Sequence, residues 1–211
     1  MFPLRYAFQP VATCHRFASP PRMDGRFAEW TSTYLLPEWF PGDGPDPFAS
    51  VYAAWDEDHL YFAAQVNLRR LPRVNPSRFW MGDVFEIFLD LRGLLAHNEY
   101  TEHCVHFYFL PEGAGNSQPR GGRCEPAVET GVAVPDDPTL RVSGQTYAQG
   151  YRLEIALSRE AVPTYDPVAY RSIGFNYLLR DAAGRVQYWS VGKDLATYRD
   201  PSTWGLLELV D

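Results

Sequence analysis

The sequence predicts an all-β protein, namely a single antiparallel β-sandwich, jelly-roll-like and with long loops. Three observations lead to this fold class. Apolar and polar residues alternate with a period of two in several short segments, clusters of Gly, Pro, Asp and Asn separate these segments, and no amphipathic helix of useful length competes with them. Short strands without intervening helices are typical of sandwiches and barrels of antiparallel sheets.

Alternation is clearest in segments 60–66 and 84–89, where every second residue is apolar on one face. The residues that alternation places in the core include Leu60, Phe62, Phe85, Ile87, Ile155 and Phe175. Further strands are expected at Val51–Trp55, Cys104–Leu110, Thr139–Gln149, Tyr151–Leu157, Ile173–Arg180, Val186–Val191 and Leu206–Val210.

Polar and glycine-rich segments predict the connections. Segment 56–59, Asp-Glu-Asp-His, is a hairpin turn whose acidic side chains we expect to be solvated. The stretches 41–47 and 111–122 are rich in Pro and Gly and are expected to form surface loops. The second stretch lacks the Gly-Lys-[Ser/Thr] ending of a phosphate-binding loop, so we assign it no ligand.

Composition indicates one folded domain spanning residues 1–211. The chain has 211 residues, of which 45% are hydrophobic and 15% aromatic, which is well above the range for disordered proteins. Its net charge of −7, without any run of Lys or Arg, provides no attractive field for nucleic acid or for an anionic membrane surface. We therefore expect neither nucleic acid nor a membrane as a partner.

The cysteines and the N-terminus bear on the cellular compartment. Cys14, Cys104 and Cys124 are an odd number, which fits reduced thiols better than a disulfide framework, although one bridge plus one free thiol stays open. The N-terminus lacks the apolar segment and cleavage site of a secretory signal. On the sequence as given we expect a cytoplasmic protein, and a secreted one if the N-terminus has been trimmed.

One segment joins an aromatic residue to a carboxylate. Trp80 lies in a turn just before a strand, and Glu86 lies within that strand between apolar residues of its own face. A carboxylate among apolar neighbours must be paired, hydrogen-bonded or turned into a polar cleft. His106 and Arg180 are its candidate partners.

A second aromatic residue, Tyr198, precedes the last predicted strand. A flat ring covers the apolar face of a sugar or a base, and a nearby carboxylate supplies directional acceptors. Trp80 and Tyr198 together therefore suggest an aromatic clamp. The alternative is structural: the aromatic residues close the open end of the sandwich, and Glu86 forms only an ion pair.

Glycoside hydrolysis is disfavoured by the spacing of the carboxylates. It requires two carboxyl groups about 5–9.5 Å apart, whereas Glu86 and Asp90, on one strand face, are separated by about 13 Å, and Asp83 has the opposite parity. Asp181 could reach Glu86 from a neighbouring strand, so hydrolysis stays open. We expect a binding module without catalytic residues.

Four segments resemble a known family. Met23–Trp30 is similar to an opening I-D-G-x-x-D-E-x-W pattern, and Ala54–Tyr61 is similar to a W-D-E-x-Y-L-Y hairpin. Segments 173–181 and 198–206 resemble I-G-F-N-x-x-x-N-D and W-R-D-P-S-x-[FW]-G-x-L. These are patterns of the family-nine carbohydrate-binding modules, in the wider DOMON-like group, and the resemblance runs from about Met23 to the C-terminus.

Within this resemblance, Trp80 and Glu86 match the first stacking Trp and a sugar-binding Glu. Tyr198 stands where a second stacking Trp is expected, and it stacks with less area. His106 stands where an Arg would reach the sugar, and it lacks the permanent fork of donors of Arg. Arg180 stands at a family Asn, as does Leu195, so we do not carry over the family's reducing-end specificity.

The resemblance implies non-catalytic binding of a mono- or oligosaccharide in a cleft at one end of the sandwich. The residues expected to bind the ligand are Trp80, Glu86, His106, Arg180, Asp181 and Tyr198. No cofactor is expected, although the family resemblance allows a structural calcium ion. The rival interpretation is a structural or interaction domain of the same fold that has lost the sugar site.

Two other ligand types were weighed. Cys104 and His106 alternate onto one strand face, with Cys124 or His103 as further donors, but the paired C-x₂₋₄-C spacing of structural zinc sites is absent. Some DOMON-like relatives hold haem through His or Met, and Met81 with His106 or His103 would be the candidates here. No C-x-x-C-H motif is present, so such a haem would be bound non-covalently.

Overall fold

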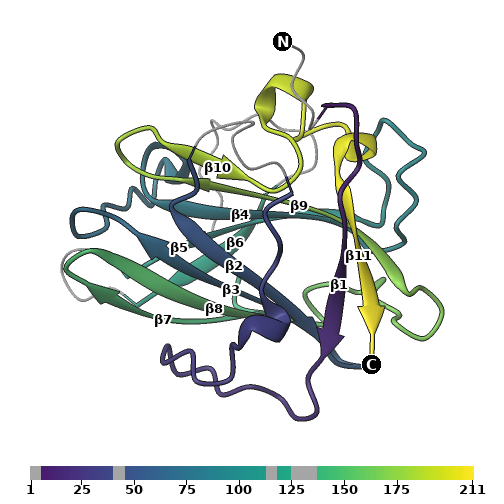
Figure 1. Ribbon diagram of the computed structural model, residues 1–211, viewed down its shortest axis with the longest axis horizontal. Helices are drawn as coiled ribbons and strands as arrows, with labels where there is room; N and C mark the ends of the chain where they lie inside the picture. The colour runs from purple at the N-terminus through teal and green to yellow at the C-terminus, as the bar shows by residue number, and fades with distance from the viewer. Residues whose placement is uncertain (1–5, 40–45, 113–117, 125–136) are drawn as a thin grey trace.

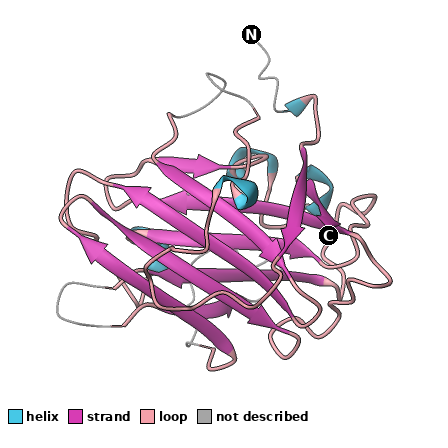
Figure 2. Cartoon of the chain, turned by 60° about the horizontal axis from the view of Figure 1, so that its bottom comes forward, coloured by secondary structure: helices cyan, strands magenta, loops and turns pink. Residues whose placement is uncertain are grey.

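The computed structural model describes residues 6–39, 46–112, 118–124 and 137–211, in which strands dominate and helical turns are short (Figures 1 and 2). The strands are β1 (Val11–Arg16), β2 (Ala49–Trp55), β3 (His59–Asn67), β4 (Val84–Asp90), β5 (Cys104–Leu110), β6 (Arg120–Cys124), β7 (Leu140–Tyr147), β8 (Gly150–Ser158), β9 (Ser172–Arg180), β10 (Val186–Tyr188) and β11 (Gly205–Val210). The 3₁₀ helices are η2 (Ser32–Tyr34), η3 (Phe79–Met81), η4 (Lys193–Leu195) and η5 (Pro201–Thr203). Among these helices none is long and apolar enough to cross a lipid bilayer.

The strands form one folded-over sheet in the order β6-β5-β4-β9-β11-β1-β2-β3-β8-β7, with β10 paired to β9. The pairings are antiparallel except those of β1, which runs parallel to both β11 and β2. In Figure 1, β1 and β11 lie side by side across the ends of the other strands. They link the layer that contains β4 and β9 to the layer that contains β2, β3 and β8, so the predicted β-sandwich is confirmed.

Alternation builds the core between the two layers. The six residues predicted for it are all fully buried: Leu60, Phe62, Phe85, Ile87, Ile155 and Phe175. Phe62 of β3 and Phe175 of β9 stack across the layers with ring centroids 5.4 Å apart and planes at 4°. Burying such a side chain is worth about 1.5–3 kcal/mol, so these contacts hold the two layers together.

Two strands escaped the prediction. β1 buries only the small side chains of Ala12 and Cys14, which give a weak alternating signal. β6 begins at Arg120, inside the stretch expected to be a loop, so that part of the expectation is wrong. Its Gly121 packs beneath the ring of Phe109 on β5, where an added Cβ would lie 2.5 Å from a ring atom.

The hairpin turn at residues 56–59 is confirmed, but one of its acidic side chains is not solvated. Asp56 accepts hydrogen bonds from the backbone of Asp58 and His59 at 2.8 and 2.7 Å, and from the Tyr61 hydroxyl at 2.6 Å. Asp56 therefore shapes the turn. Glu57 faces solvent and pairs with Arg16 at 2.6 Å.

A buried carboxylate connects the N-terminal segment to the layer that contains β2, β3 and β8. Glu154 of β8 accepts hydrogen bonds from the Gly25 backbone, from Trp30 Nε1 at 3.1 Å and from Ser143 Oγ at 3.2 Å. Burial raises the pKa of Glu154, and these three hydrogen bonds counteract part of that rise. The segment that matches the opening family pattern is thus a structural element.

Two amide side chains form hydrogen bonds with backbone groups near β10: Asn176 with the residues that follow β10, and Gln187 with the start of β2. Asn176 of β9 accepts from the Ser190 backbone at 2.9 Å and donates to the Val191 carbonyl at 2.8 Å, so β10 is shorter than the expected 186–191 strand. Gln187 of β10 accepts from the N–H groups of Phe48 and Ala49 at 2.7 and 2.9 Å. Its Nε2 donates to the Ala49 carbonyl and to the Tyr177 hydroxyl, both at 2.9 Å.

We expect Gln187→Ala to lower the free energy of unfolding by about 2 kcal/mol, because it leaves buried backbone groups of Phe48 and Ala49 without partners. Urea unfolding measures this change. Gln149→Ala is the control, since that side chain is exposed, and it should have an effect within about 0.5 kcal/mol. Equal effects of the two substitutions would contradict the bridging role of Gln187.

Candidate functional site

The outer face of the β4–β5–β9 layer carries three of the predicted polar residues, Glu86, His106 and Arg180. Odd-numbered residues of β4 enter the core, so Glu86 points to the opposite face. In the strand register, Glu86 lies opposite Tyr108 of β5 and Leu178 of β9. The fold thus places the carboxylate in the middle of this layer.

Glu86 and His106 form a buried pair. The Nε2 atom of His106 lies 2.9 Å from Glu86 Oε2, and the side chains are 3% and 0% exposed. The His106 ring stacks on Phe88 with centroids 4.2 Å apart and planes at 20°. Because the ring is held on one side by stacking and at one nitrogen by hydrogen bonding, the orientation of the Glu86 carboxylate is fixed as well.

Three buried polar atoms near this pair have no hydrogen-bond partner among the described residues. They are Glu86 Oε1, Arg180 Nε and the hydroxyl oxygen of Tyr100. Leaving a buried polar group unpaired costs about 1–3 kcal/mol, and such groups mark places that a ligand or a water completes. The structure therefore holds open donors and acceptors beside a buried carboxylate.

Electrostatic effects show that these groups share one neighbourhood. Burial raises the pKa of Tyr198, the charge of Glu86 adds to the rise, and Arg180 opposes it. Burial also raises the pKa of Tyr100 well above its ordinary value, with further contributions from the charges of Cys104, Cys124, Glu86 and Tyr198. The charge of Glu86 thus acts on both Tyr100 and Tyr198.

Tyr198 lies against the Glu86–His106 pair. Its ring packs edge-on against Phe88 at 5.3 Å and lies 5.7 Å from the His106 ring. It is 8% exposed and belongs to an apolar cluster with Phe88, Leu178 and Trp204.

Trp80 belongs to a different apolar cluster, which contains Phe79 and Tyr108. Trp80 is half-buried on η3 and meets Phe79 edge-on at 5.2 Å, while Phe79 stacks on Tyr108 at 4.2 Å. Because Tyr108 is the register partner of Glu86, this cluster lies next to the carboxylate. Trp80 and Tyr198 therefore belong to separate clusters around Glu86, and their role as a clamp stays a prediction.

Asp83 positions the loop that carries Trp80. Its carboxylate, fully buried, accepts from both terminal nitrogens of Arg70 at 2.8 and 2.9 Å, from the Arg73 backbone and from the Ala182 backbone. The Asp83 N–H in turn donates to the Arg73 carbonyl at 2.8 Å. This network joins the loop before η3 to the turn after β9.

The structure does not bring Asp181 together with the other predicted ligand residues. Its carboxylate accepts from Arg185 Nε at 2.6 Å and from backbone amides of Ala183 and Arg185 at 2.9 Å. Burial acts to raise the pKa of Asp181, but these hydrogen bonds outweigh it and leave the pKa lowered. Asp181 shapes the turn between β9 and β10.

Tyr100 was not found from the sequence. It lies between β4 and β5, in a segment without periodicity, and its ring packs edge-on against Trp204 at 5.7 Å. No local pattern indicates that a tyrosine there lies close enough to Glu86 to be influenced by its charge. Only the tertiary fold reveals it.

The other ligand types find no support in the described part of the chain. Met81 is 57% exposed, whereas His106 is buried and bonded to Glu86. Within the described ranges no group of three or more His, Cys, Asp or Glu side chains could hold a metal ion. Because calcium is also bound by backbone carbonyls, the structural calcium ion that the resemblance allows stays a prediction. The three cysteines are buried and free.

Comparison with known proteins gives one family and several similar folds. A family model described as carbohydrate family 9 binding domain-like matches residues 25–211. A carbohydrate-binding module of family 9 from Caldicellulosiruptor kristjanssonii, in complex with cellotriose, has 17% identity and a TM-score of 0.64, covering 95% of this chain and 93% of that one. The same kind of module in complex with glucose has 16% identity and a TM-score of 0.63, covering 95% of each chain.

A protein from Bacteroides uniformis is also similar, with 10% identity, a TM-score of 0.57 and coverage of 96% of this chain and all of that one. At these identities the likenesses show the fold alone. No curated protein matches the sequence.

We expect Asp83→Ala to destabilise the protein by about 3 kcal/mol, because it breaks a buried ion pair and leaves two backbone amides without an acceptor. The substitution should also shift the fluorescence emission of Trp80, because the loop that carries Trp80 loses its hydrogen bonds to Asp83. Comparison with the Trp80→Phe variant identifies the contribution of Trp80 to the emission. The measurement is urea unfolding with tryptophan emission. Asp58→Ala is the matched control, since its pair with Arg159 is largely exposed and should contribute less than about 1 kcal/mol.

Proposed function

Because this chain belongs to the carbohydrate family 9 binding domain-like family, we propose that it binds a mono- or oligosaccharide without catalysis on the outer face of β4, β5 and β9. The observation that carries the proposal is the set of unpartnered buried atoms of Glu86, Arg180 and Tyr100. A sugar hydroxyl both donates and accepts hydrogen bonds, so it can satisfy a carboxylate oxygen and an N–H group at once.

In the proposed complex, each residue has a distinct part. Glu86 Oε1 accepts a hydrogen bond from a sugar hydroxyl, and Arg180 Nε donates one to a sugar hydroxyl. The Tyr100 hydroxyl can donate or accept. His106 positions the Glu86 carboxylate through the bond at 2.9 Å. Trp80 and Tyr198 would cover the apolar faces of the ring.

Absence of catalysis is part of the proposal. Glu86 and Asp90 lie on one face of β4, four residues or about 13 Å apart, which is too far for a glycosidase pair. Asp181, the other carboxylate that could have served, is bonded to Arg185 and to its own turn.

The first experiment is calorimetric titration with glucose and cellotriose, the sugars bound in the two similar modules. The proposal predicts saturable binding that Glu86→Gln weakens at least tenfold, because the amide cannot reproduce two carboxylate acceptors. A domain that has lost its sugar site would give no heat with either sugar or with a wider oligosaccharide array. Release of reducing sugar by the purified chain would instead overturn the non-catalytic assignment.

Trp80→Ala should weaken sugar binding more than Tyr198→Ala, because the indole offers the larger apolar face and stacking adds about 0.5–1.5 kcal/mol beyond area. Trp80 is half-buried, so its variant should remain folded with a small fall in melting temperature. Val168→Ala, at a side chain 82% exposed, is the control for both. If Trp80→Ala lowers the melting temperature strongly and the unsubstituted protein binds no sugar, the aromatic residues have a structural packing role and not a binding role.

Tyr100→Phe removes only a hydroxyl that has no partner among the described residues. We therefore expect unchanged or slightly higher stability and roughly three- to tenfold weaker sugar binding. Tyr147→Phe is a control with the opposite pattern: its hydroxyl donates to the Val66 carbonyl at 3.1 Å on the other layer, so stability should fall and affinity should not change. Loss of stability in Tyr100→Phe without loss of affinity would exclude the hydroxyl from the site.

A further inference from the structure

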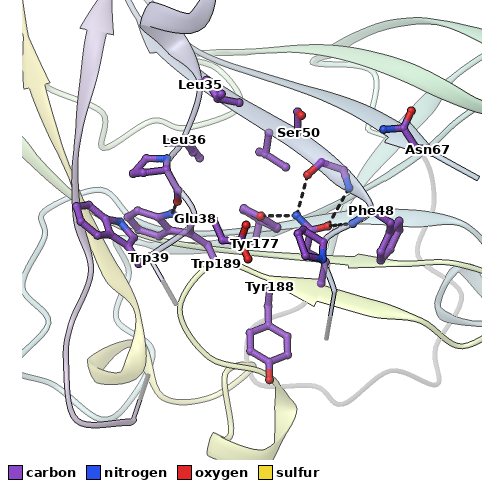
Figure 3. Close-up of a pocket in the computed structure, with 15 residues that line it drawn as sticks. Leu35, Leu36, Glu38, Trp39, Phe48, Ser50, Asn67, Tyr177, Tyr188 and Trp189 are labelled. Atoms are coloured by element: carbon purple, nitrogen blue, oxygen red, sulfur yellow. Dashed lines mark hydrogen bonds between the residues drawn. The ribbon is translucent and has the colours of Figure 1, made fainter. Parts of the chain in front are cut away.

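A hollow lies at the seam where β10 meets the start of β2 (Figure 3). It is a pocket of about 350 Å³, within the range of roughly 300–1,000 Å³ found for small-molecule sites. Its lining includes aromatic side chains from four segments: Trp39, Phe48, Tyr177, and the adjacent Tyr188 and Trp189. Polar side chains at the same pocket include Glu38, Ser50 and Asn67.

The pocket is separate from the Glu86 site. Tyr177 of β9 lines the pocket and belongs to the core face of its strand. Leu178, the next residue, lies on the other face in the cluster with Tyr198. Since successive residues of a strand point to opposite sides of the sheet, the sheet itself separates the two sites.

The floor of the pocket is fixed before any ligand arrives. The Gln187 side chain is bonded to the backbone of Phe48 and Ala49 and to the Tyr177 hydroxyl (dashed lines in Figure 3). Trp189 Nε1 donates to the Pro37 carbonyl at 3.1 Å. A floor held by these bonds loses little conformational freedom when a ligand binds.

The walls combine apolar faces with a polar rim. Trp39 is 44% exposed and lies with Trp189 on one side of the view in Figure 3, while Phe48 lies on the other side and Tyr188 below. Glu38 and Asn67 are exposed and Ser50 is half-buried. A pocket that joins an exposed indole to hydroxyl, amide and carboxylate groups elsewhere in its lining fits a ring with one apolar face and hydroxyls at its edge.

We propose that this pocket is a second saccharide subsite, in which Trp39 covers a sugar ring and Glu38 and Ser50 bond its hydroxyls. Glu38 is the charged side chain among the residues that line it, and the Arg185 guanidinium lies 4.4 Å from the ring centroid of Phe48. The choice of a saccharide rests on the proposed function, whereas the position of the pocket does not. With both subsites, one chain would hold a glycan at two places on opposite faces of one sheet.

Fluorine NMR can test both sites in one titration. The chain has six tryptophans, and labelling with 5-fluorotryptophan gives each a signal; Trp39→Phe and Trp80→Phe assign the two of interest. On titration with cellotriose, the Trp39 signal should shift saturably, and this shift should persist in Glu86→Gln. Glu38→Gln should weaken the affinity measured from the Trp39 signal about tenfold and leave the titration of the Trp80 signal unchanged. Val168→Ala should change neither titration.

Each outcome separates the two proposals. A saturable shift of Trp80 alone would overturn the second subsite and leave the proposed function intact. A saturable shift of Trp39 alone would support the second subsite and count against the Glu86 site. If neither signal moves with cellotriose, both proposals fail for this glycan, and a Trp39 shift with choline but not with cellotriose would reassign the pocket to a cation and overturn the saccharide.

Discussion

The strict alternation of side chains along β4 and β9 is the constraint on which the rest of the structure depends. Phe85 and Ile87 enter the core from β4, and Phe175 enters it from β9. The same geometry forces Glu86 onto the outer face. A shift of one residue in the register would exchange the two sets, burying the carboxylate between the layers and exposing the aromatic core.

Much of the fold could be predicted because large apolar residues carry the alternating signal. β5 was placed to the residue, and most other strands differ from their predicted limits by one or two residues. β6 could not be found because its Arg-Gly-Gly-Arg-Cys sequence has little strand propensity; its glycine is required by the Phe109 ring of the neighbouring strand. β1 is held by parallel pairing on both sides, which is a tertiary effect without a local sequence signal.

The candidate site was predictable where it follows from strand parity, and not elsewhere. The need to satisfy a carboxylate among apolar neighbours led to His106 and Arg180 as candidate partners of Glu86, and His106 lies 2.9 Å from it. Neither argument applies to residues between strands, so Tyr100 was missed. Parity also separates Arg180 from Asp181, although the two are adjacent in sequence. Arg180 interacts with Tyr198, whereas Asp181 accepts a hydrogen bond from Arg185.

The amide side chain of Gln187 has a consequence for association between molecules. A strand that ends a sheet normally presents free N–H and C=O groups, to which a strand from another chain can add. At the start of β2, Gln187 occupies the N–H groups of Phe48 and Ala49 and the carbonyl of Ala49. β2 lies inside the sheet, but β1 pairs only with its last two residues, Ala54 and Trp55. At the start of β2, one side chain thus occupies hydrogen-bonding groups to which a strand from another molecule could otherwise add.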